Sequence, residues 1–197
     1  MSTYDQGDMP FARGQTFFGS GTPDATSGAH LEGRKYRCKD TASGREVLLQ
    51  IVRNSAPYVL AAKRVVQYEV SADYGRQVDG YAFATAQDVA GVVDDAYGSN
   101  TIALLDLFYI VIEGAVDVLT ALEANANNLL PAGTVVVALT AVTSGSTTAG
   151  RMAPQDLTGA TALLGDQIQN AFGRVITART TTNTNTGTRL EVGRGAV

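Results

Sequence analysis

Reactive side chains are few in this sequence and lie far apart. Cys38 is the only cysteine and His30 the only histidine. One cysteine excludes an intramolecular disulfide, and one cysteine with one histidine supplies too few ligands for a zinc site. Cys38 lies in an alternating run, whereas His30 lies in a glycine-rich segment. We therefore interpret Cys38 as a small buried hydrophobe and not as a nucleophile paired with a base.

Acidic residues offer the next possible chemistry, because Asp88, Asp94 and Asp95 lie close together. Their spacing matches neither an EF-hand loop nor a glycine-rich nonapeptide repeat, so we interpret them as acids of surface turns and not as calcium ligands. No spacing selects a catalytic pair of carboxylates, and neither of the glycine-rich nucleotide-binding motifs occurs. We expect a protein that is not an enzyme and that has no cofactor and no bound metal.

The charge balance bears on the class of partner. The formal net charge is −4, whereas binding to nucleic-acid phosphates requires clustered lysine and arginine. Short basic runs occur at residues 34–37 and 63–64, and we interpret them as solvated strand faces. The longest apolar run, residues 102–112, contains Asp106 and is too short to cross a bilayer. The N-terminus lacks the pattern of a secretory signal. We expect a soluble product that is made in a cytoplasm, with neither nucleic acid nor membrane as a direct partner.

The composition indicates the fold class. A length of 197 residues suits one large domain, or one domain with an extended segment. The apolar share comes more from alanine and valine than from leucine or phenylalanine, and glycine and threonine are abundant. Charged residues make up 17%, below the usual quarter. This composition predicts a mostly β fold with many short strands and turns.

One stretch, residues 107–120, is the central element of that fold. Its core, Phe108 to Val111, is aromatic and β-branched, and Asp106 and Gly114 flank it as local breakers. This pattern predicts a strand that is buried on both faces or lies at the centre of a sheet. The stretch carries no reactive group, which indicates a scaffold and not a catalytic element.

Other strands follow from alternation and turn residues. Residues 35–52 read as a β-hairpin with a short glycine-containing loop, and Pro57 ends the segment after it. In the segment 171–178, Gly173 indicates a bulge or a close backbone approach, and residues 180–187 read as a hairpin loop. We expect at most one short helix, near residues 157–169. Further strands are predicted at residues 63–70, 89–93, 134–140 and 188–192. We expect the strand at 107–120 to pair in chain order with those at 135–140, 172–178 and 189–192.

Residues 1–30 form an extended N-terminal arm by the same criteria, because proline and glycine are too frequent there for a helix or a long strand. Phe11, Phe17 and Phe18 lie among these breakers. Aromatic residues in such a segment pack against something, either the body of the same chain or a neighbouring subunit. Both interpretations remain open at this stage.

Five motifs of the C-terminal half occur in a recognisable order. They are Asp106-Leu-Phe-Tyr-Ile-Val-Ile-Glu-Gly114, Pro131-Ala-Gly-Thr-Val-Val-Val137, Ala149-Gly-Arg-Met152, Ala171-Phe-Gly-Arg-Val-Ile-Thr-Ala178 and Arg189-Leu-Glu-Val192. The order resembles small β-barrel capsid decoration (cement) proteins of tailed bacteriophages, over residues 100–195. The resemblance implies a small antiparallel β-barrel or sandwich, with the arm at 1–30, an N-terminal β region at 31–100 and a C-terminal β-barrel at 101–197. The chain departs from the smallest family members by its long N-terminal region.

The resemblance also implies a function. A protein of this family adds to the outside of an assembled capsid, often as a homotrimer, and joins neighbouring major capsid proteins. That implies a location on the outer surface of the virion, after synthesis in the host cytoplasm. Possible contacts with the capsid or with another subunit are Phe11, Arg13, Phe17, Phe18 and Arg151, although Arg151 is also readily interpreted as a solvated loop residue.

Two alternatives remain beside this function. One is another head or tail structural component. The other is a carbohydrate-binding or adhesion module on the virion, which would need exposed aromatic side chains on loops. Tyr74, Tyr81 and Tyr97 are the candidates for such a role.

Overall fold

A computed structural model of the protein describes residues 9–18, 28–39, 44–69, 74–81, 89–119, 130–138, 150–154, 171–178 and 187–193. The mostly β fold is confirmed over these residues, which contain twelve strands, two 3₁₀ turns and no α-helix. The helix expected near 157–169 lies outside them. The elements are η1 (Ala29–Leu31), β1 (Lys35–Lys39), β2 (Glu46–Asn54), β3 (Leu60–Ala61), β4 (Val65–Tyr68), β5 (Gln77–Gly80), β6 (Val89–Val93), η2 (Asp95–Tyr97), β7 (Thr101–Ile102), β8 (Leu107–Val118), β9 (Val135–Ala138), β10 (Met152–Pro154), β11 (Ala171–Val175) and β12 (Thr188–Val192).

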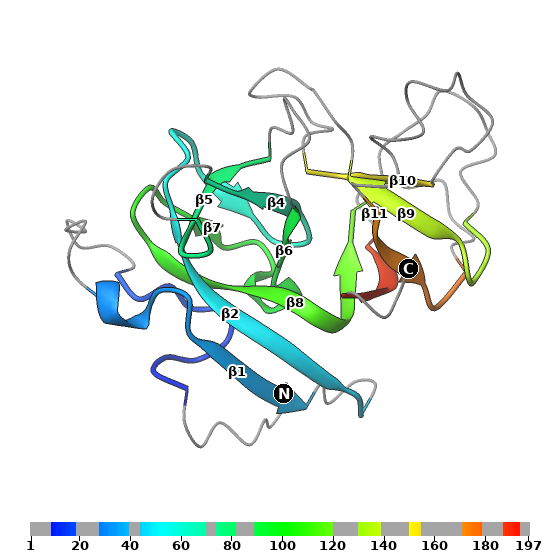
Figure 1. Cartoon of the computed structure of the whole chain (residues 1–197), viewed down its shortest axis with the longest axis horizontal. Coiled ribbons are helices and arrows are strands. Elements are labelled where there is room, and N and C mark those ends of the chain that lie inside the picture. The colour runs from blue at the N-terminus through cyan, green and yellow to red at the C-terminus, as the bar shows by residue number, and fades with distance from the viewer. Residues whose placement is uncertain are drawn as a thin grey trace.

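Five strands close into a ring (Figure 1). The neighbours around it are β2, β5, β4, β6 and β8, and β8 pairs again with β2. All of these pairs are antiparallel except β2 with β5, which is parallel. Closure pairs every ring strand on both sides, which removes the unpaired edges that open sheets present to other chains.

A second group of strands extends from the ring as a continuation of the same sheet. Its order from β8 outward is β12, β11, β9 and β10, all antiparallel. We expected these strands to pair in chain order, with β9 next to β8, and that order is wrong. The β11–β12 hairpin places the last strand beside β8, which leaves β9 farther out.

Strand β8 belongs to both groups. Its residues from Leu107 to Glu113 pair with β2, and those from Gly114 to Val118 pair with β12. Gly114, the local breaker that flanks the apolar core of this stretch in the sequence, lies inside β8 at the point where the pairing partner changes. Its φ is +102°, and a Cβ there would lie 2.5 Å from the carbonyl oxygen of Glu46. Glycine is required for both reasons.

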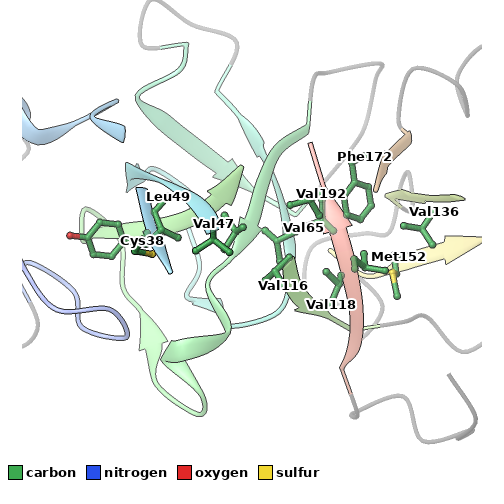
Figure 2. Packing of buried hydrophobic residues seen from close by; sticks show 14 of the residues in the cluster. Cys38, Val47, Leu49, Val65, Val116, Val118, Val136, Met152, Phe172 and Val192 are labelled. Atoms are coloured by element: carbon green, nitrogen blue, oxygen red, sulfur yellow. The ribbon is translucent and has the colours of Figure 1, made fainter. Parts of the chain in front are cut away.

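The expected burial of β8 is confirmed. Every residue from Leu107 to Val111 is fully buried. Alternate side chains enter two different apolar clusters, with Tyr109 and Val111 in one and Phe108 and Ile110 in the other. The first cluster extends from Cys38 in β1 to Val136 in β9 and Met152 in β10 (Figure 2). Cys38 is 6% exposed, which agrees with a buried hydrophobe.

The local predictions hold at the other strands. The 35–52 hairpin is confirmed, with Lys39 opposite Glu46 at its closed end. Gly173 marks a register shift against β9, and a Cβ there would lie 2.8 Å from the carbonyl oxygen of Glu191. The division into an N-terminal β region and a C-terminal β-barrel stays a prediction, and β8 pairs with strands on both sides of residue 100.

The change of partner at Gly114 generates a stability prediction. We expect Gly114→Ala to lower the free energy of unfolding by about 2–4 kcal/mol, because the methyl group adds a backbone clash to an unfavourable positive φ. Gly133→Ala is the matched control, since its φ is +88° and nothing lies within 4 Å of the added Cβ. It should cost about 1 kcal/mol. Equal losses in urea titrations of the two variants would contradict the role assigned to Gly114.

Candidate functional site

A buried ion pair fixes the N-terminal segment on the body of the chain. The guanidinium of Arg13 donates from Nε to Oδ2 of Asp94 at 2.5 Å and from Nη2 to Oδ1 of the same carboxylate. The two side chains are 6% and 0% exposed. Such a two-pronged contact is the geometry that guanidinium and carboxylate groups favour. The pair joins residues that are 81 positions apart in the chain.

The burial of Asp94 corrects one expectation. We interpreted Asp94 as an acid of a surface turn, and the structure buries it completely. The reason lies in the local chain path, because β6 ends at Val93 and Asp94 is the N-cap of η2. Its carboxylate accepts a hydrogen bond from the backbone N–H of Ala96 at 3.1 Å. The cap aims the carboxylate inward, where the arm supplies Arg13.

Two tyrosine hydroxyls hold the backbone of the same segment. Tyr109 donates to the carbonyl oxygen of Phe11, and Tyr97 donates to that of Gln15, both at 2.9 Å. The Tyr97 hydroxyl also accepts from the backbone N–H of Tyr109 at 3.0 Å. Burial raises the pKa of both tyrosines well above the ordinary value, so both hydroxyls stay protonated as donors even at alkaline pH.

Apolar contacts complete the attachment. The ring of Phe11 lies 4.5 Å from that of Tyr109 and 5.8 Å from that of Phe17, measured between centroids. The backbone N–H of Phe17 donates to the carbonyl oxygen of Leu107 at 3.0 Å. Of the two interpretations left open, the structure thus places residues 9–18 on the body of their own chain. Residues 1–8 and 19–27 lie outside the described part.

The five predicted contact residues do not form one exposed surface. Phe11, Arg13, Phe17 and Phe18 lie together on the body, and among them Phe17 is the most exposed, at 37%. Arg151 precedes β10 and is only 6% exposed, so its interpretation as a solvated loop residue is wrong. Contact of these residues with a capsid or a second subunit stays a prediction.

The three tyrosines considered for carbohydrate binding do not form an exposed cluster. Tyr74 is 52% exposed, whereas Tyr81 and Tyr97 are 9% and 1% exposed. Tyr81 accepts from the backbone N–H of Ala61 through its hydroxyl, and burial raises its pKa to about 12. Tyr81 and Tyr97 therefore serve the interior of the fold.

Charged groups gather next to the Arg13–Asp94 pair. Arg189 lies 3.2 Å from a carboxylate oxygen of Asp95 and 3.5 Å from one of Asp117. Burial, followed by the charges of Asp94 and Asp117, raises the pKa of Asp95 to about 6, while Arg13 and Arg189 oppose that shift. No group of three or more metal-ligating side chains occurs within the described ranges. Over those same ranges no helix has the length and apolar character needed to span a membrane.

A second buried polar group escaped the sequence analysis. Arg53 is 1% exposed, and its Nε donates to a carboxylate oxygen of Glu32 at 2.5 Å. Asn54 beside it is fully buried and donates from Nδ2 to the carbonyl oxygens of Ile102 and Ala103 at 3.1 Å. Sequence patterning marked Arg53 and Asn54 only as the end of a hairpin, and no local signal announces their distant partners.

Comparisons with known proteins give little further information. No protein-family model matches the chain, and no curated protein matches it. Among solved structures, the head fiber gp8.5 N base of bacteriophage phi29 is similar to it, with a TM-score of 0.42 and 14% sequence identity. The match covers 77% of this chain and 98% of that one. At this TM-score and identity, the similarity establishes neither a shared fold nor a shared function.

The first prediction from this site concerns Arg13. We expect Arg13→Met to lower the free energy of unfolding by about 3–5 kcal/mol, because it leaves the buried Asp94 carboxylate without its counter-charge. Arg37→Met removes an exposed pair with Glu46, in which the side chains are 65% and 74% exposed. That control should change stability by less than about 0.5 kcal/mol. Similar losses in the two variants, measured by chemical denaturation, would contradict a special role for the buried pair.

The second prediction concerns pH. The pKa of Asp95 is raised in the folded state, so the folded protein binds more protons than the unfolded chain between pH 3.8 and about 6. The contribution of Asp95 to stability therefore falls as pH rises through this window. Asp95→Asn should be more stable than the parent protein at pH 7, and the difference should vanish near pH 3.5. A difference that is independent of pH in denaturation series would contradict this assignment.

Proposed function

We propose that the protein is a structural component of a bacteriophage head that binds the outside of the assembled capsid. In this role it bridges neighbouring major capsid proteins, acts as a homotrimer and catalyses no reaction. The observation that carries the proposal is the placement of the motifs that resemble decoration proteins. Four of them fall on β8, β12, β11 and β9, and these are consecutive neighbours in one antiparallel array. Motifs scattered over unrelated parts of the fold would not have supported the resemblance.

The architecture suits a bridging role for physical reasons. The ring leaves none of its strands with a free edge, and β8 joins the ring to the outer array as one continuous strand. A load applied to one group of strands is therefore transmitted to the other through the covalent backbone of β8 and the hydrogen bonds on either side of it. A protein that binds only the assembled shell stabilises it by mass action, and many modest contacts on a repeated lattice add up by avidity.

The arm contributes to the same role by being pre-ordered. Residues 9–18 are held by the Arg13–Asp94 pair and two tyrosine hydroxyls before any partner arrives. Ordering a segment costs conformational entropy, and a segment that is already ordered on its own body does not add that cost to binding. The exposed ring of Phe17 is then presented in a fixed position.

The test uses phage heads that lack the protein. Purified chain should co-sediment with such heads to a saturating level of many copies per head, and it should raise the temperature at which they release DNA. An unrelated β protein of similar size and charge serves as the control and should do neither. Absence of co-sedimentation, or binding without any gain in heat resistance, would contradict the proposal. A saturating level of only a few copies would favour a tail or connector component instead.

A further inference from the structure

One loop on the ring shows backbone strain that its immediate surroundings hold in place. Leu105 has a φ of +70°, a region that side-chain-bearing residues rarely adopt. Its carbonyl oxygen accepts from Nη1 of Arg53 at 2.8 Å, and its N–H donates to the carbonyl oxygen of Asn54 at 2.8 Å. Strain of this kind costs on the order of 1–3 kcal/mol and persists only where the structure over-determines it.

A further buried acid, Asp106, stabilises the same turn. Asp106 is 4% exposed, and its carboxylate accepts from the backbone N–H of Ala103 at 3.0 Å. The N–H of Asp106 donates in return to the carbonyl oxygen of Ala103 at 3.2 Å. Arg53, Asn54 and Asp106 are thus three buried polar side chains that hydrogen-bond to the backbone of one turn. Burial of polar groups is unfavourable without such hydrogen bonds, so this arrangement fixes the turn in one conformation.

The fixed turn presents apolar side chains to solvent. Leu104 is 47% exposed, and Val59, on the neighbouring segment, is 55% exposed. The two segments run side by side, because β3 pairs with β7 and Asn54 donates to the carbonyl oxygens of both Tyr58 and Ala103. Pro57 and Ala103 are exposed beside them. We call the four exposed residues, Pro57, Val59, Ala103 and Leu104, the apolar rim.

We propose that the apolar rim is a rigid docking surface for an uncharged, apolar depression on the major capsid protein. This inference rests on the proposed function and assigns a contact surface to it. The absence of charge around the rim and its small area indicate this kind of partner. Residues 57–62 and 99–105 contain no charged side chain. A partner would therefore be bound through burial of apolar surface and not through ion pairs.

Area argues against a second copy of the chain as the occupant. A stable, specific interface buries about 800 Å² on each partner, which four side chains of this size do not supply. Such a small contact becomes effective when linked copies of it bind together, as the proposed homotrimer would on a lattice that repeats the site. Rigidity also matters more for a small contact, because there is little binding energy to offset ordering.

The test measures binding of the full chain to heads that lack it. The double variant Val59→Ser/Leu104→Ser should bind about tenfold more weakly or worse, with an unchanged unfolding midpoint. Tyr74→Ser is the matched control, because Tyr74 is 52% exposed and lies outside the rim, and it should bind as the parent does. Raising the salt concentration should leave the difference between double variant and parent intact, since charge is not involved.

A second variant tests whether binding depends on the conformation of the turn as well as on the side chain of Leu104. Leu105→Gly relieves the positive φ and loosens the turn while leaving Leu104 in the sequence, so binding should weaken without loss of stability. Equal binding of the double variant and the parent protein would overturn the docking surface while leaving the proposed function intact. A lowered unfolding midpoint in the double variant would show a structural role for the rim and would also overturn it. Failure of the parent protein to bind heads would overturn the proposed function, and the assigned partner with it.

Discussion

The pairing of β8 with different strands along its length is the constraint on which the rest of the structure depends. Up to Glu113 the strand completes the ring with β2, and from Gly114 onward it starts the outer array with β12. The change requires backbone of β2 and β8 to approach closely at Gly114, where no side chain fits. Because the same strand is buried on both faces, the two apolar clusters and the two groups of strands are both supported by β8.

Buried polar groups then position the segments that strands do not hold. Arg13 with Asp94 attaches the N-terminal segment, and Arg53 with Asn54 fixes the turn before β8. A buried ion pair adds little net stability, since desolvation offsets the attraction between the charges. Its effect here is selective, because one conformation of each segment satisfies the buried groups and others leave them without partners. Residues 9–18 and the turn before β8 are thereby attached to the strands.

Sequence patterning predicted elements whose cause is local. The 35–52 hairpin, the strand at 89–93 and the buried run at 108–111 follow from alternation, β-branched residues and turn chemistry, and all are found. Features with distant causes were not accessible. Asp94 appeared as a surface acid because its partner lies 81 residues away, and the order of strand pairing depends on how the β11–β12 hairpin folds back.

The same distinction applies to the candidate contact surfaces. The aromatic residues of the arm were conspicuous among glycines and prolines, so Phe11, Phe17 and Phe18 could be singled out from sequence, although not the body on which they pack. The apolar rim could not, because Val59 and Leu104 look like ordinary strand residues. Their exposure becomes evident only when β3 and β7 are paired and the turn at Leu105 is fixed.

The central claim is that the chain joins capsid proteins on the outside of a phage head. A reconstruction of the particle at a resolution that traces side chains tests it most directly. The account predicts the chain on the outer surface, each assembly in contact with at least two capsid subunits, the apolar rim seated on one of them, and residues 9–18 on their own ring. Location inside the head or in the tail, or contact with a single capsid subunit, would contradict it.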